Sequence, residues 1–142
     1  MHSQGEFDDY ILQKLKLDTA TSIISIRPNA AIGHKPDGKP LKVNYELVSE
    51  DWSKKALIIA KYQEVSGSTQ DKLVYDFIKL GYVMDANPKI TKSWLIIGGK
   101  GWDSGFIKFL KMELRDWVPR LDARLIFVPN ISDLESVNFT DF

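Results

Sequence analysis

The chain has no cysteine, only two histidines and no net charge at neutral pH. The missing cysteines exclude disulfides and thiolate metal sites, which fits a reducing compartment such as the cytoplasm. His2 and His34 are too few and too widely separated for a histidine metal cluster. Because nineteen basic residues balance nineteen acidic ones, any surface for nucleic acid or anionic lipid has to be local.

Long hydrophobic runs are also missing. Nowhere do about eighteen apolar residues follow one another, and the first residues lack a basic stretch followed by an apolar one. We therefore expect a soluble, intracellular protein that does not enter the membrane. With 142 residues, of which 44% are hydrophobic and 27% charged, the composition is that of one ordinary globular domain over 1–142.

Apolar spacing and turn residues predict the secondary structure. The predicted segments are, in chain order, a helix over 4–17, a strand over 22–27, a loop over 31–40, strands over 41–48 and 56–65, a helix over 68–81, a strand over 93–97, a helix over 106–117, a strand over 124–128 and an acidic, loosely packed tail over 130–142. Pro28 and Asn29 are expected to end the first strand, and Gly81 the second helix. This order predicts an α/β fold with a central mixed β-sheet flanked by helices.

The most informative stretch runs from Ala56 to Leu73, where Lys61 interrupts a hydrophobic strand. Removing an ammonium group from water is unfavourable unless the group reaches water, a partner or a ligand. Lys61 is therefore either part of a site or a lysine at a sheet edge that opposes aggregation.

The residues around Lys61 resemble the PD-(D/E)XK nuclease superfamily, the restriction-endonuclease-like proteins with an αβββαβ core. In restriction-type members, an acidic-X-Lys triplet on the third strand is followed by Gln and a Ser-Gly-Ser/Thr turn, as in Lys61-Tyr62-Gln63 and Ser66-Gly67-Ser68 here. The segments Gly5–Ile11 and Trp94–Trp102 also resemble such enzymes. The resemblance implies a Mg²⁺-dependent DNA endonuclease, often a homodimer, whose strand lysine helps water to attack the phosphodiester.

Two expected carboxylates are absent. Ile59 occupies the acidic position two residues before Lys61, and Asn44 is the expected counterpart of the second-strand aspartate. Regular alternation would put Glu46 on the same face as Asn44, so Glu46 is one candidate replacement ligand, together with Glu6 and Asp8 of the first helix. Two other acids fit less well. Asp37 lies in a turn-rich loop, and Glu64 has the opposite parity to Lys61.

Several residues are candidates for contacts with DNA. Ser66 and Ser68 precede a helix and are able to bind phosphate or only to cap the helix, and Lys72 follows in its first turn. Lys39 and Lys42 lie near the second strand, whereas Lys100 lies in a glycine-rich connection. Solvated surface lysines are the alternative for each of these cations.

Two functions therefore stay open at this point. The first is a restriction-type endonuclease with Lys61, Gln63, Asn44 and Glu46 in its site and with Mg²⁺ held by Glu46, Glu6 and Asp8. The second is a catalytically degenerate nuclease-like domain that binds DNA or a partner chain.

Overall fold

The computed structural model describes residues 3–35, 37–64, 69–102, 104–117 and 124–142. The helices are α1 (Gln4–Thr19), α2 (Thr69–Ala86) and α3 (Ser104–Trp117), and the strands are β1 (Ser25–His34), β2 (Pro40–Val48), β3 (Lys55–Tyr62), β4 (Ile90–Gly98) and β5 (Leu125–Val128). A short 3₁₀ helix, η2 (Ile131–Ser136), follows β5. The predicted element order is confirmed.

The five strands form one sheet in the order β1-β2-β3-β4-β5. The pairs β1–β2 and β2–β3 are antiparallel, whereas β3–β4 and β4–β5 are parallel. The helices α2 and α3 make the two crossovers that parallel neighbours require. The predicted α/β fold with a mixed sheet and flanking helices is thereby confirmed.

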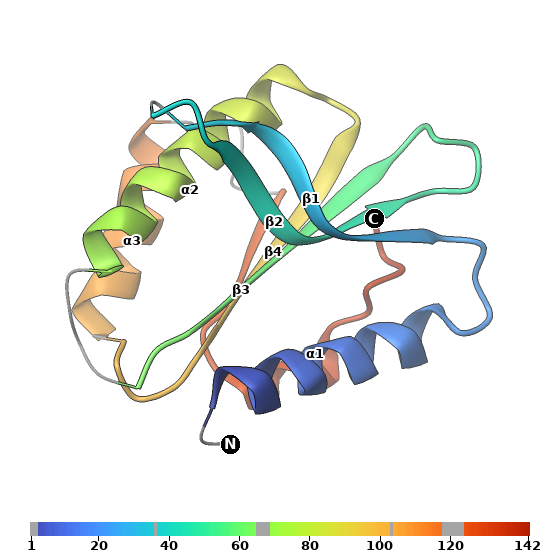
Figure 1. Ribbon diagram of the computed structural model, residues 1–142, viewed down its shortest axis with the longest axis horizontal. Helices are drawn as coiled ribbons and strands as arrows, with labels where there is room; N and C mark the ends of the chain where they lie inside the picture. The colour runs from blue at the N-terminus through green and yellow to red at the C-terminus, as the bar shows by residue number, and fades with distance from the viewer. Residues whose placement is uncertain (1–2, 36, 65–68, 103, 118–123) are drawn as a thin grey trace.

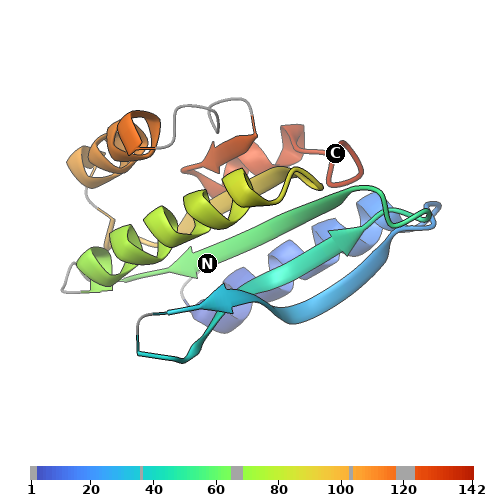
Figure 2. The same cartoon turned by 90° about the horizontal axis from the view of Figure 1, so that it is seen from above.

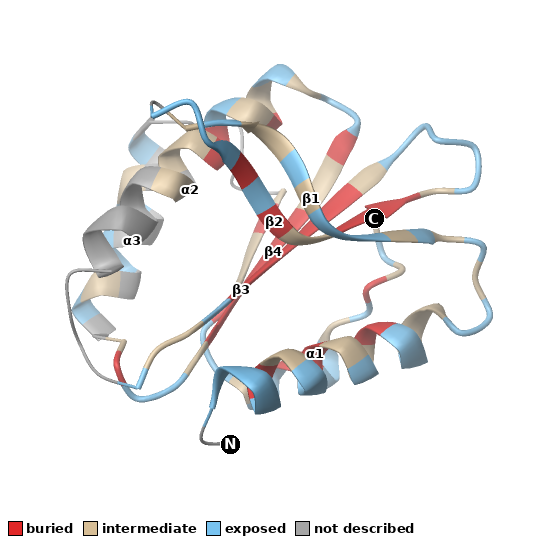
Figure 3. Cartoon of the chain, in the orientation of Figure 1, coloured by how far each residue is buried: buried red, intermediate tan, exposed pale blue. Residues whose placement is uncertain are grey.

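Each face of the sheet carries its own hydrophobic core. Figure 1 shows α1 and the C-terminal segment on one face and α2 with α3 on the other, and Figure 2 shows the same layers from above. Phe7, Ile11 and Leu15 anchor α1 on the first face. Leu80 and Met84 anchor α2 on the second. The buried residues follow the middle strands (Figure 3).

The hairpin of β1 and β2 has a kink at Asn29 and Asn44. These residues lie opposite each other, between the paired positions Pro28–Tyr45 and Ala30–Val43, and Asn29 has a φ of 53°. Asparagine tolerates this left-handed conformation better than most residues. The prediction that Pro28 and Asn29 end the strand is wrong, because the turn signal produces a kink inside a strand that continues to His34.

Because of the kink, the two halves of β2 direct their apolar side chains to opposite faces of the sheet. Tyr45 packs with the core on the α1 face, whereas Val43 packs with the core on the α2 face. Regular alternation would put both residues on one face. Alternation along the predicted strand over 41–48 puts Leu41, Val43, Tyr45 and Leu47 on one face, and the structure splits this face in two at Asn44.

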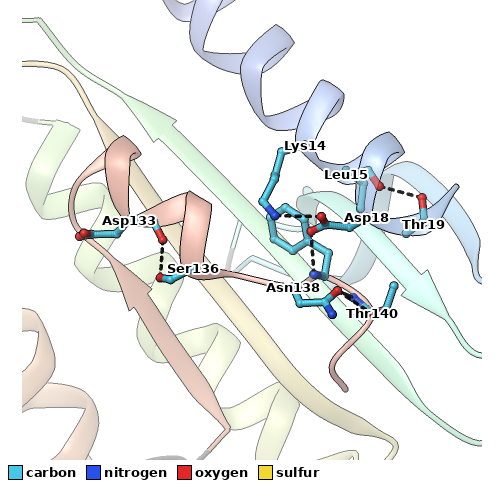
Figure 4. A network of polar contacts seen from close by, with 9 residues as sticks. Lys14, Leu15, Asp18, Thr19, Asp133, Ser136, Asn138 and Thr140 are labelled. Carbon is cyan, nitrogen blue, oxygen red and sulfur yellow. Dashed lines mark hydrogen bonds and ion pairs between the residues drawn. The ribbon is translucent and has the colours of Figure 1, made fainter.

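The C-terminal tail is part of the core, which corrects the expectation of loose packing. Leu134 and Phe139 are both fully buried, and the ring of Phe139 meets Trp94 edge-on with 5.1 Å between ring centroids. The Phe139 backbone N–H donates to Asp18 at the end of α1 over 3.0 Å. Figure 4 shows these polar contacts between α1 and the tail. The apolar residues within the acidic segment explain its position.

Gly81 does not end the second helix. It lies buried within α2, which continues to Ala86. Arg124 satisfies the end of this helix, because its guanidinium donates to the carbonyl oxygens of Met84 and Asn87 over 2.8 and 3.1 Å. Such contacts take the place of a glycine cap.

Among the helices in the described part of the chain, none has the length and apolar character needed to cross a membrane.

We predict that Phe139→Ala lowers the free energy of unfolding by about 3–5 kcal/mol, because it leaves a cavity beside Trp94. Chemical denaturation of the purified protein measures this change. The exposed Glu135 on the same segment provides the control, and Glu135→Ala should change stability by less than about 0.5 kcal/mol. Equal, small effects of both substitutions would show that the tail adds little to the core.

Candidate functional site

Lys61 lies near the end of β3 and is exposed. It lines a small pocket on the α2 face together with Lys42 of β2 and Asp76 of α2. No ion pair to Lys61 or Lys42 occurs within the described residues. Asp76 instead faces Lys35, with 3.6 Å between the carboxylate and the ammonium nitrogen. Two cations without an ion-pair partner among the described residues thus flank this pocket.

The floor of the same pocket is apolar. Ile59 and Val43 line it, with exposed fractions of 6% and 3%. Both belong to the hydrophobic core under α2, together with Leu80. The β2 residue that shares the face of Ile59 is therefore Val43 rather than Asn44. Aliphatic side chains, Val43 and Ile59, therefore occupy the two strand positions at which carboxylates would lie beside Lys61.

Asn44 takes part in the sheet itself. Its side-chain oxygen accepts a hydrogen bond from the Ala60 backbone N–H over 2.8 Å. The regular β2–β3 pairing ends at Tyr45 and Ile58, so the amide replaces the backbone acceptor that the kink removes. Asn44 lies on the α1 side of the sheet with Ala60, across from the Lys61 pocket.

Glu46 lies away from Lys61, next to two other cations. Its carboxylate lies 3.6 Å from Arg27 and 3.9 Å from Lys55. It pairs in register with Leu57, which precedes Lys61 by four residues, or about 13 Å of strand. The expectation that Glu46 shares the face of Asn44 is wrong because of the kink. The structure does not bring Glu46 and Lys61 together.

Of the two acids expected from α1, Asp8 reaches a pocket and Glu6 is exposed near the start of the helix. Asp8 lines a cavity of about 240 Å³ with Asn44, Asn29 and Tyr45. Burial raises the pKa of the Tyr45 hydroxyl, and the carboxylates of Asp8 and Asp9 raise it further. The structure thus brings together Asp8 and Asn44, but on the opposite face from Lys61.

Gln63 is held by the connection between β4 and α3. Its backbone N–H donates to Gly98 over 3.0 Å, and its carbonyl accepts from the Gly101 N–H over 2.7 Å. Gly99 has a φ of 93°, and a Cβ there would overlap the Gln63 carbonyl. The exposed Lys100 is thereby fixed beside the end of β3, as the carboxyl ends of parallel strands share an edge.

The remaining basic and polar candidates are distributed as follows. Lys39 is exposed in the β1–β2 turn, where its backbone N–H donates to Asp37 over 2.9 Å. This turn contact is the role that the structure shows for Asp37. Ser66 and Ser68 lie outside the described residues, and so does the side chain of Lys72.

The described residues near Lys61 do not suit Mg²⁺, which prefers several carboxylate or carbonyl oxygens in octahedral geometry. The pocket offers one carboxylate, Asp76, which already faces Lys35. The cavity beside α1 also offers one carboxylate, Asp8. No group of three or more His, Asp or Glu side chains suited to a metal occurs in the residues described.

Sequence reasoning missed Asp76, Asn29 and Tyr45. Asp76 falls within a predicted helix, but no sequence spacing relates that helix to Lys61. Asn29 carried a signal, because asparagine after proline favours a left-handed or turn conformation. The contact between Tyr45 and α1 depends on the kink, which alternation alone does not reveal.

A comparison with protein families finds that a family model described as a PD-(D/E)XK nuclease superfamily domain matches residues 5–141. The match therefore runs from the first turn of α1 to the end of the C-terminal segment. No significant match occurs among curated proteins or among solved structures.

We predict that Gly99→Ala is more destabilising than Gly38→Ala. Both glycines have positive φ, 93° and 82°, which costs an alanine about 1–2 kcal/mol. Only at Gly99 does the added Cβ overlap another residue, whereas Gly38 faces open space. Overlap should add about 1–3 kcal/mol to the loss in unfolding free energy. Equal losses in a denaturant titration would contradict the tight contact with Gln63.

Proposed function

This chain belongs to the PD-(D/E)XK nuclease superfamily, and we propose that it binds the phosphate backbone of DNA at the Lys61 end of the sheet without hydrolysing it. The observation that carries this proposal is that two core residues, Ile59 and Val43, line the pocket beside Lys61. The lineage supports nucleic acid as the ligand, while the side chains described near Lys61 do not supply the ligands for metal-assisted hydrolysis.

The absence of hydrolysis follows from the chemistry of the pocket. Metal-assisted phosphodiester cleavage needs a cation that activates water and stabilises the developing charge on phosphorus. Lys61 supplies a positive charge, but the described residues beside it offer only one carboxylate, Asp76, which already faces Lys35. Ile59 and Val43 are core residues, so exchanging either for a carboxylate would also bury a charge.

Three exposed lysines support binding to the phosphate backbone of DNA. Lys61 and Lys42 flank one pocket, and Lys100 follows the glycine that packs on Gln63. All three are exposed, and none makes an ion pair within the part of the chain that is described. Lysines of this kind contact phosphates without reading bases, and their binding releases counterions from DNA.

We predict that Lys42→Ala/Lys61→Ala weakens binding to duplex DNA and lowers the salt dependence. Each lost phosphate contact reduces the slope of log affinity against log salt by about 0.9, so the double variant should lose about 2. Fluorescence anisotropy with a labelled duplex at several salt concentrations measures this slope. Lys89→Ala is the control. Lys89 is exposed just before β4, where β4 pairs with the start of β3 and not with Lys61. An unchanged slope in the double variant would contradict the proposed surface.

We predict that the native chain does not cleave supercoiled or linear DNA in the presence of Mg²⁺ or Mn²⁺. Val43→Asp/Ile59→Glu puts two carboxylates on the face of Lys61, and any activity gained should disappear when Lys61→Ala is added. Asn44→Asp/Ile59→Glu is the comparison, since Asn44 lies on the other face. Circular dichroism checks that the variants fold. Cleavage by the native chain that Lys61→Ala abolishes would overturn the proposal and favour an active endonuclease.

A further inference from the structure

We propose that Trp52 and Arg27, at the turn between β2 and β3, form a stacking site for an unpaired base of single-stranded nucleic acid. The inference rests on the proposed function for its ligand class, because the lineage supports nucleic acid. It concerns a second surface, since Trp52 precedes β3 whereas Lys61 lies near the end of that strand. Figure 1 shows this turn at the end of the sheet opposite to the connection between β4 and α3.

Trp52 has a backbone conformation that is unfavourable for its residue type. Its φ is 63°, and a bulky residue rarely adopts this left-handed region. Glycine or asparagine would adopt it at a lower cost. The Trp52 ring belongs to neither hydrophobic core, and the residue is 54% exposed. Core packing therefore does not explain a tryptophan at this position.

The contact with Arg27 does not explain it either. The guanidinium carbon of Arg27 lies over the Trp52 ring, 4.8 Å from the ring centroid, which is a cation–π geometry. At an exposed site, such a contact typically stabilises by no more than the left-handed conformation costs. Residues held in unfavourable conformations cluster at functional sites, and we therefore attribute the tryptophan to a ligand.

Hydrogen bonds hold the turn in this conformation. The Trp52 N–H donates to the Ser49 carbonyl over 3.0 Å. Asp51 accepts from the hydroxyl and the backbone N–H of Ser53 over 2.7 and 3.0 Å, and from the Ser49 hydroxyl over 2.9 Å. These bonds lower the pKa of Asp51 to about 2, so its carboxylate stays an acceptor at neutral pH. A ring on a fixed turn loses little freedom when it binds a flat ligand.

A buried acid lies beside Arg27. The Glu46 carboxylate is 3.6 Å from the Arg27 guanidinium, and its side chain is 10% exposed, whereas 47% of the Arg27 side chain is exposed. A guanidinium carries five N–H donors in one plane. The exposed part of Arg27 therefore offers a charge for a phosphate next to a ring that offers a face for a base.

These two groups match one nucleotide of a single strand. Proteins bind single strands by stacking the bases on aromatic rings, with cation–π contributions from arginine and positive charge along the backbone. The stacked base itself is uncharged. This suits the mixed charge of the turn, where Glu50 and Asp51 accompany Lys54. An acidic peptide would instead meet two like charges there, which disfavours it as the ligand.

The test compares two single-stranded hexamers of equal charge. One is a hexamer of deoxythymidine, and the other has abasic residues in place of the bases. Because both carry the same phosphates, the difference in their affinities reports on contacts to the bases. We expect the native chain to bind the thymidine hexamer about tenfold more tightly, in line with one stacked base. Fluorescence anisotropy of the labelled hexamers measures both affinities.

Trp52→Asn should remove this preference, because asparagine tolerates the positive φ but has no ring. Trp52→Phe keeps a ring and should retain part of the preference. Tyr82→Ala is the matched control, since Tyr82 is an aromatic residue of similar exposure, 49%, on α2. This control should keep the full preference. Circular dichroism checks that each variant folds.

Heteronuclear NMR identifies the ring that binds. The chain has four tryptophans, each with one indole N–H signal, and the Trp52 signal is the one missing from the spectrum of Trp52→Asn. The thymidine hexamer should shift this signal, whereas the signal of the buried Trp94 should stay in place.

The inference is overturned if the native chain binds both hexamers equally, which would favour a protein partner for this turn, or if Trp52→Asn keeps the preference. The proposed DNA surface fails separately. Lys42→Ala/Lys61→Ala should weaken duplex binding and lower its salt dependence but keep the ratio between the two hexamers. A native chain that ignores duplex DNA yet prefers the thymidine hexamer would refute the proposed function alone.

Discussion

The structure depends on the hydrogen bond between the Asn44 side chain and the Ala60 backbone N–H, 2.8 Å long, at the point where β2 leaves β3. An N–H group in the interior of a sheet is costly to leave without an acceptor. The side-chain oxygen supplies that acceptor and allows the hairpin to kink. With the positive φ of Asn29 opposite, it turns the outer half of the hairpin toward α2. Both pockets border this kink.

The kink also determines which residues could act together. On the α2 face, β2 offers Val43 to Ile59 and Lys61, so the space beside the lysine is filled by core side chains. Burying two aliphatic side chains stabilises the fold by about 1.5–3 kcal/mol each, whereas two carboxylates there would need cationic or metal partners. The chain thus combines a nuclease fold with a strand interior suited to packing. The acid on β2, Glu46, finds its cations in Arg27 and Lys55.

The sequence predicted the order of elements and the mixed sheet because both depend on local periodicity and chain connectivity. It also predicted the anomaly at Lys61, since a charge within an apolar strand is visible without coordinates. It failed at Pro28–Asn29, where the same residues that end strands produced a kink. The single face expected for Val43 and Tyr45 is therefore split, whereas Ile59 and Lys61 share a face as alternation predicts. The burial of Phe139 and the partners of Glu46 depend on contacts between distant segments, which no local pattern contains.

The zero net charge conceals a division between the two faces. Lys42 and Lys61, which make no ion pair with the described residues, flank the pocket under α2, while the charges of Asp8 and Asp9 act on Tyr45 beside α1. Because a strand alternates its side chains, Ala60 and Lys61 present these two environments from adjacent residues of β3. Charges that cancel over the whole chain therefore remain compatible with phosphate binding, because the cations and the carboxylates lie on opposite faces of one strand end.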